Sequence, residues 1–135
     1  MVIQGAADHV TRRDLHGDDP PSLALTDHPD VLAFTTEPLI KPVEVVGTPR
    51  VELWLSSDAP DTVLFVMLLD LYPSSDDYPS GYRLNVCDSI MRVRYRQGFS
   101  EPVFLTPGVP VAVSFDLYPT ATRFMPGHRL QLLVT

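Results

Sequence analysis

The stretch RVELWLSSDAPDTVLFVMLLDLY, residues 50–72, decides the fold class. Apolar and polar residues alternate from Val51 to Ser56, and this period of two predicts a strand with one buried face. The polar SSDAPD, residues 56–61, favours a loop, because Asp58 and Pro60 are turn formers. Residues 62–72 are nearly all apolar, which is typical of a central strand covered on both faces. Strand, loop and strand within 23 residues indicate an antiparallel β structure.

The same pattern recurs from Asp30 onward. Fourteen prolines among 135 residues leave little room for long helices. Short runs rich in β-branched and aromatic residues are separated by turn residues, and Asp88–Ser89 is expected to form a tight hairpin turn. The expected strands are 31–36, 43–49, 50–56, 62–72, 82–87, 90–97, 109–120 and 127–135. About eight short strands predict an all-β fold, an antiparallel jelly-roll-like β-sandwich.

The length of the chain predicts its domain organisation, and its charge limits its possible partners. One domain is expected, with residues 1–29 as an irregular polar lead segment and residues 30–135 as the sandwich. The formal net charge of −7 argues against nucleic acid as a partner, and a single lysine, Lys41, argues against an anionic membrane. We find no apolar run of 18 residues and no leader, so we expect no membrane span, no targeting signal and a cytoplasmic location.

Patterns for catalysis and cofactors are missing from the sequence. No serine lies in Gly-x-Ser-x-Gly, and the seven glycines form no phosphate-binding loop, so no catalytic residue and no cofactor is predicted. Cys87 is the one cysteine, and His128 is the one histidine outside the lead segment. A Cys87–His128 nucleophile pair is therefore a third, weaker option, set against a buried, inert thiol.

The acidic and histidine-rich lead segment is the other place to look for a metal. Its spacing matches no zinc pattern, so we interpret it as a solvated acidic loop. The run SSDD, residues 74–77, lacks the central glycine and terminal glutamate of a calcium loop, so no metal site is predicted. The candidate ligands in the lead segment are His9, His16, His28, Asp8, Asp14, Asp18, Asp19 and Asp27.

Two further sets of side chains are candidates for binding. In IMRVRYRQ, residues 90–97, alternation places Arg92, Arg94 and Arg96 on one face of the expected strand. This arginine stripe suits an anion or a carboxylate, although pairing with the abundant Asp and Glu, or docking against an acidic neighbouring domain, is favoured. The aromatic residues that a ligand such as carbohydrate would use are Trp54, Tyr72, Tyr78 and Tyr82, although scattered rings are usually packing residues.

Four stretches in order resemble one family. DVLAFTTEPL, VEVVGTPRVELWLSSDAPDT, IMRVRYR and YPTATRFMPGHRLQLLVT are similar to the C-terminal β-sandwich of the X-prolyl dipeptidyl-peptidase and cocaine-esterase family of serine hydrolases. In that family, an α/β-hydrolase domain carries the Ser-Asp-His triad, and the jelly roll packs on it and helps to shape the substrate pocket. No triad residue maps onto this chain, and the resemblance implies that His128 is a structural residue, hydrogen-bonded at a strand start.

The resemblance leads to a functional expectation. It implies a non-catalytic accessory domain, whose partner is the α/β-hydrolase catalytic domain, with a free-standing ligand-binding module as the alternative. Family members continue past GHRLQLLVT, so the chain is expected to lack the last strands of the sandwich. An incomplete sheet leaves unpaired backbone groups at an edge. We therefore expect a second copy or residues 1–29 to cover that edge.

Overall fold

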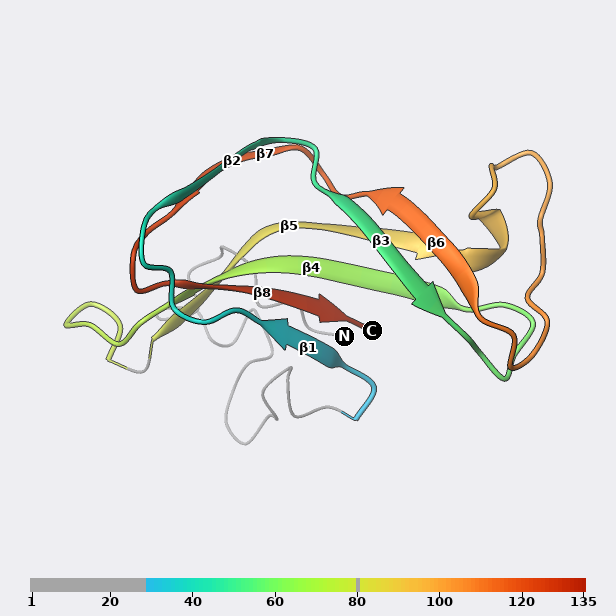
Figure 1. Cartoon of the computed structure of the whole chain (residues 1–135), viewed down its shortest axis with the longest axis horizontal. Coiled ribbons are helices and arrows are strands. Elements are labelled where there is room, and N and C mark those ends of the chain that lie inside the picture. Colours follow the sequence, from blue (N-terminus) through green and yellow to red (C-terminus); the bar gives the residue numbers. More distant parts are fainter. Residues whose placement is uncertain (1–28, 80) are drawn as a thin grey trace, which may run out of the picture.

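The computed structural model describes residues 29–79 and 81–135, and these residues form an antiparallel β structure (Figure 1). The elements are β1 (Leu32–Thr35), β2 (Val43–Gly47), β3 (Arg50–Leu55), β4 (Val63–Tyr72), β5 (Tyr82–Arg92), the 3-10 helix η2 (Val93–Tyr95), β6 (Val111–Asp116), β7 (Thr120–Phe124) and β8 (Arg129–Val134). The described part contains no α-helix. In particular, it contains no helix long and apolar enough to cross a membrane.

Two layers of unequal width form the sandwich. One layer is a four-stranded sheet in the order β1-β8-β4-β5. The other consists of two ribbons, β2-β7 and β3-β6. Only residues 48–49 separate β2 from β3, and only residues 117–119 separate β6 from β7, so the two ribbons form one bent arm over the sheet (Figure 1). Gly47 lies at the bend with φ +121°, a conformation in which a residue with a Cβ would be strained. The predicted fold class, an antiparallel β-sandwich, is confirmed.

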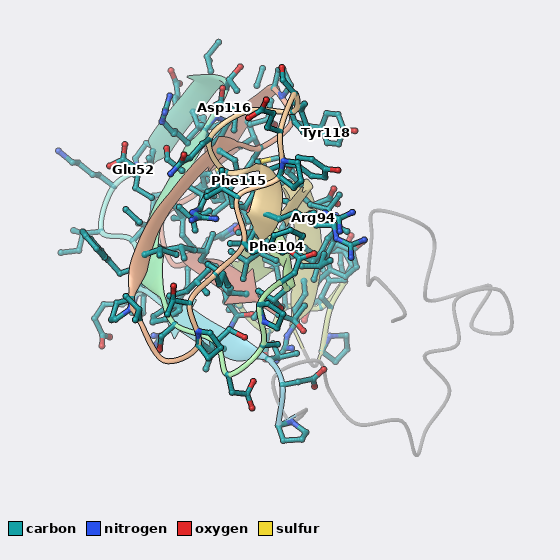
Figure 2. All side chains as sticks on the ribbon, turned by 90° about the vertical axis from the view of Figure 1, so that its right-hand side faces the viewer. Glu52, Arg94, Phe104, Phe115, Asp116 and Tyr118 are labelled. Atoms are coloured by element: carbon teal, nitrogen blue, oxygen red, sulfur yellow. The ribbon has the colours of Figure 1, made fainter. Side chains whose placement is uncertain are left out.

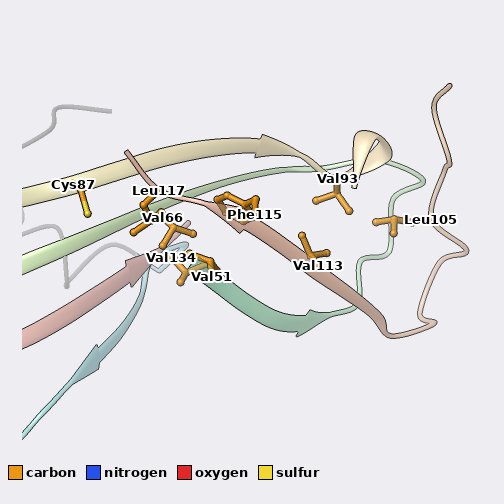
Figure 3. Packing of buried hydrophobic residues seen from close by; sticks show 9 residues of the cluster. All are labelled: Val51, Val66, Cys87, Val93, Leu105, Val113, Phe115, Leu117 and Val134. Atoms are coloured by element: carbon orange, nitrogen blue, oxygen red, sulfur yellow. The ribbon is translucent and has the colours of Figure 1, made fainter. Parts of the chain in front are cut away.

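The core follows from the alternation along the strands. On β3, the side chain of Val51 faces inward and the side chain of Trp54 faces solvent, as the period of two predicts. β4 contributes to both faces of its sheet, with Val66 toward the arm and Met67 on the opposite face, and both are buried. Figure 3 shows the cluster between the layers, made of Val51, Val66, Cys87, Val93, Leu105, Val113, Phe115, Leu117 and Val134.

The hairpin expected at Asp88–Ser89 is wrong. β5 runs without a break from Tyr82 to Arg92, and Asp88 and Ser89 stand opposite Met67 and Val66 of β4. A two-residue hairpin turn needs a positive φ, which glycine adopts most readily. No non-glycine residue in the described part has a positive φ. Instead, β5 pairs with the long apolar β4 along its whole length, and the register is interrupted only by an irregularity between Leu68 and Leu69.

Two other boundaries differ from the expected ones. The chain leaves the strand conformation at Val93 and forms η2, so Arg92, Arg94 and Arg96 do not share one strand face. The strand β7 was not predicted, because Thr120–Arg123 lacks an apolar alternation; this segment is held by pairing with β2. Two expected strands are joined in β5, and β7 is an additional strand. The described part therefore has eight strands, in agreement with the expected number.

Candidate functional site

A buried acid–histidine pair lies near one end of the sandwich. Asp70 is on β4, only 2% exposed, and its Oδ1 is 2.9 Å from Nδ1 of His128. His128 belongs to the turn before β8, and backbone hydrogen bonds of 2.8 Å link that turn to Leu39 through Gly127 and His128. The hydrogen bond expected of a histidine at a strand start is therefore present. Asp70 was not singled out from the sequence, although it is the one charged residue in the apolar run 62–72.

The electrostatics of this pair follow from burial. Loss of solvent raises the pKa of the Asp70 carboxyl, while the hydrogen bond and the charge of His128 oppose that rise. In its ionised form the Asp70 carboxylate can only accept, and Nδ1 of His128 is then the donor in this contact. The pair resembles the acid–base half of a catalytic triad. In the described part, however, no serine hydroxyl and no cysteine thiol forms a hydrogen bond with His128.

A cluster of three tyrosines adjoins this pair through Tyr72. The ring of Tyr72 lies 4.3 Å from the ring of His128 and meets those of Tyr78 and Tyr82 edge-on at 5.8 and 5.7 Å. Tyr78 and Tyr82 stack at 4.9 Å. Burial raises the pKa of the Tyr72 hydroxyl, with a further contribution from Asp70. These rings pack on one another, and the exposed Trp54 lies apart from them on β3, so the four aromatic residues do not form one platform.

Cys87 lies in the core between the layers. Burial raises the pKa of its thiol, and the neighbouring Asp88 adds to the effect, which disfavours the nucleophilic thiolate. No hydrogen bond joins Cys87 to His128 within the described residues. The geometry therefore gives no support to the nucleophile pair considered above.

The arginines of the stripe lie at the other end of the sandwich. Arg92 and Arg94 bind one carboxylate there, that of Asp61, and these three residues are called the clamp. Nε of Arg92 donates to Asp61 at 2.7 Å, and the backbone N–H of Arg94 donates to the same carboxylate at 3.1 Å. The guanidinium of Arg94 lies over the ring of Tyr95, 5.0 Å from its centroid. Arg96 donates to the carbonyl oxygens of Val93 and Val103.

Asp61 is the centre of this clamp. Burial alone would raise the pKa of its carboxyl, but hydrogen bonds from Arg92 and Arg94, together with their charges, outweigh burial and lower the pKa. Pairing with a carboxylate, the favoured interpretation of the stripe, is present for Arg92 and Arg94. Asp61 itself was missed, because the sequence gives no sign that this one aspartate of the loop faces the arginines.

The described residues include no group of three His, Cys, Asp or Glu side chains that could hold a metal ion. His9, His16 and His28 lie outside the described residues, and so do the aspartates near them. The prediction about that segment therefore stays a prediction.

Comparison with known proteins gives the context of these sites. Residues 5–135 match the family model described as the X-Pro dipeptidyl-peptidase C-terminal non-catalytic domain. The chain is 36% identical over 122 residues to the cocaine esterase of Rhodococcus sp. (strain MB1 Bresler), a match that covers 89% of this chain and 20% of the esterase. The resemblance inferred from four sequence stretches is confirmed.

Solved structures agree with this match. The chain superposes on an α-amino acid ester hydrolase with a TM-score of 0.78 and 41% identity, over 82% of this chain and 19% of the hydrolase. It also superposes on an aminopeptidase from the marine sediment archaeon Thaumarchaeota archaeon, with a TM-score of 0.77 and 31% identity, over 82% of this chain and 18% of the aminopeptidase. The chain thus spans about one fifth of the length of these relatives.

Proposed function

Because the chain belongs to the family of C-terminal non-catalytic domains of X-Pro dipeptidyl-peptidases, we propose that it acts as an accessory domain of a serine hydrolase. In this proposal, the sandwich packs on an α/β-hydrolase domain and helps to shape the substrate site. The parent enzyme would be an X-Pro dipeptidyl-peptidase or an acyl esterase, since the similar proteins include a cocaine esterase and an amino acid ester hydrolase.

One observation carries the proposal. The residues that most resemble catalytic ones are used for packing: Asp70 and His128 join β4 to the start of β8, and Cys87 lies in the core. A fold whose polar interior groups are used for its own stability suits a supporting role. The same chain would then need another polypeptide segment to supply the nucleophile.

Direct binding tests this proposal. The α/β-hydrolase domain that accompanies the chain in its parent protein is produced separately and titrated with the 135-residue chain in a calorimeter. We expect a saturable one-to-one complex. A titration without heat, together with sedimentation profiles of two separate species, would contradict the accessory role.

Trp54 supports a second candidate, a free-standing module that binds carbohydrate. Trp54 is 76% exposed on the outer face of β3, as a stacking platform for a sugar requires. In that case a glycan array gives a signal with the native chain and loses it with Trp54→Ala. If the native chain gives no signal on the array, this candidate is rejected.

We also propose contact between copies through the edge of the four-stranded sheet. Leu32 and Phe34 of β1 are both 60% exposed, although they project from the same side as their core-facing partners Val134 and Leu132 on β8. A second copy at this edge would bury them. Sedimentation equilibrium should show a dimer that Phe34→Ser weakens, and a monomer at all concentrations would refute the contact.

A cytoplasmic location is the last part of the proposal. Cys87 is a free thiol, which is compatible with a reducing compartment. Cell fractionation of the parent protein tests this location.

A further inference from the structure

Two segments meet at the end of the sandwich where β5 stops and β6 begins (Figure 1). They are the loop 56–62 and residues 93–110, which begin with η2, and together they are called the loop end. Backbone hydrogen bonds fix the loops to each other and to themselves. These bonds run from Val93 N to Thr62 O at 2.9 Å, from Val103 N to Arg94 O at 2.7 Å, from Leu105 N to Pro60 O at 2.7 Å and from Gly108 N to Ser57 O at 2.8 Å.

The loop end is also fastened to the core. Val93 and Leu105 are buried in the cluster between the layers, and Figure 3 shows both at the edge of that cluster. Asp61 holds Arg92 and Arg94, and Arg96 ties the carbonyl groups of residues 93 and 103 together. The backbone of the loop end is therefore organised before any partner binds.

This ordered segment presents large aromatic side chains to solvent. Phe99 is 82% exposed and Phe104 is 55% exposed. Figure 2 looks onto this end, and Phe104 and Arg94 both lie on the side turned toward the viewer. A single exposed apolar residue needs no explanation. Phenylalanine and arginine are enriched in protein interfaces, so two exposed phenylalanines on a fixed backbone that also carries Arg94 and Arg96 match the composition of an interface.

The charge of the loop end differs from that of the whole chain. Together with Arg92 at the end of β5, it contains three arginines and three carboxylates, Asp58, Asp61 and Glu101, and therefore has no net charge, whereas the chain has a formal net charge of −7. Arg92 and Arg94 remain partly exposed even though both pair with Asp61. A complementary partner surface would combine apolar side chains with acidic ones opposite the exposed parts of Arg92 and Arg94.

We propose that the loop end is the surface through which this chain docks on the catalytic domain of its parent hydrolase, an inference that rests on the proposed function. The partner follows from the comparisons: the chain matches about one fifth of each relative, and the family it belongs to is the non-catalytic domain. Because the loop end is already ordered, little conformational entropy is lost when the partner binds.

The exposed Trp54 provides a matched control. It lies on the outer face of β3 opposite Ala112, on a face where Arg50 pairs with Glu52 and Asp116. This face has one aromatic ring among surface ion pairs, which add little to binding. A substitution there removes an aromatic side chain outside the loop end whose exposure lies between those of Phe99 and Phe104.

Calorimetric titration with the separately produced catalytic domain tests the surface. The double variant Phe99→Ser/Phe104→Ser should raise Kd at least about 30-fold, the effect of losing one hot spot. Trp54→Ser should leave Kd within about threefold of the native value, well short of the effect of a lost hot spot. Circular dichroism melting checks that both variants remain folded. If the double variant is unfolded, amide exchange is measured in the native complex. Slower exchange of residues 97–104 in the complex than in the free chain then supports the docking surface.

The outcomes separate the two proposals. If the native chain binds and the folded double variant binds equally well, or if residues 97–104 gain no protection, the loop end is not the docking surface and the accessory role stands. If the native chain does not bind, the accessory role fails and the docking surface fails with it. If the double variant instead dissociates a dimer of this chain without changing Kd, the surface serves self-association and the proposal is overturned.

Discussion

At the scale of single residues, Asp70 shows how a polar group becomes part of a β core. It is the one charge in an apolar strand, and burial would make it costly without a partner. His128 supplies that partner from a position 58 residues away in the sequence. The pair connects the centre of the four-stranded sheet to the turn that begins β8.

Removal of the histidine should therefore destabilise the fold. His128→Ala leaves a buried carboxylate unpaired, and we expect the free energy of unfolding to fall by about 3 kcal/mol, as for other broken buried pairs. Asp70→Asn keeps an acceptor for Nδ1 and should cost about 1 kcal/mol or less. Urea unfolding followed by circular dichroism measures both. An equal, small loss in the two variants would show that the pair does not stabilise the fold.

The sequence predicted half of this arrangement. His128 was expected to hydrogen-bond at a strand start, and it does. Its acceptor was out of reach, because the sequence does not say which residue of β4 faces the turn. The same holds for Asp61, since only the folded loop shows that its carboxylate faces Arg92 and the amide of Arg94.

At the scale of elements, β5 shows that long-range pairing outweighs local turn signals. The carbonyl of Asp88 accepts from Tyr118, on the side away from β4, so the backbone groups of Ser89 point toward β4. Ser89→Pro should remove a ladder hydrogen bond and lower the free energy of unfolding by about 1–3 kcal/mol. Ser89→Ala, which keeps the backbone N–H at this half-buried position, should lower it by less than the proline variant, about 0.5 kcal/mol. Equal stability of the proline and alanine variants would indicate a turn at this position.

The clamp at the end of β5 predicts a pH dependence. Because the arginines hold the pKa of Asp61 below its ordinary value of 3.8, the unfolded chain takes up this proton first as the pH falls. The contribution of Asp61 to stability is therefore complete above the ordinary pKa and is lost as the pH falls through the folded pKa. The gap in unfolding free energy between the native chain and Asp61→Asn should be constant from pH 6 to about pH 5 and close below the ordinary pKa.

Amide exchange gives a second readout of the same clamp. The N–H of Arg94 donates to Asp61, so it should exchange faster in Asp61→Ala, which removes the acceptor. Asp58→Ala removes an exposed carboxylate of the same loop and should leave the exchange of that amide unchanged. Equal exchange of the Arg94 amide in both variants would show that Asp61 does not hold this amide.

At the scale of the whole molecule, about eight short strand patterns, such as the alternation from Val51 to Ser56, were enough to predict the class, because period two is a local property of a strand. The arrangement of the layers was not predictable in the same way. A sheet of four strands faces an arm of two paired ribbons, and this depends on pairings such as β4 with β8 that join residues far apart in the chain. The family match explains why four sequence stretches kept their order along one such scaffold.

Steady-state hydrolysis of an activated ester tests the central claim most directly. The purified chain alone should give no turnover above buffer, and its addition to the catalytic domain should raise kcat/KM until the two are equimolar. Turnover by the chain alone that disappears in His128→Ala would contradict the account, and so would a catalytic domain whose kcat/KM is indifferent to the chain.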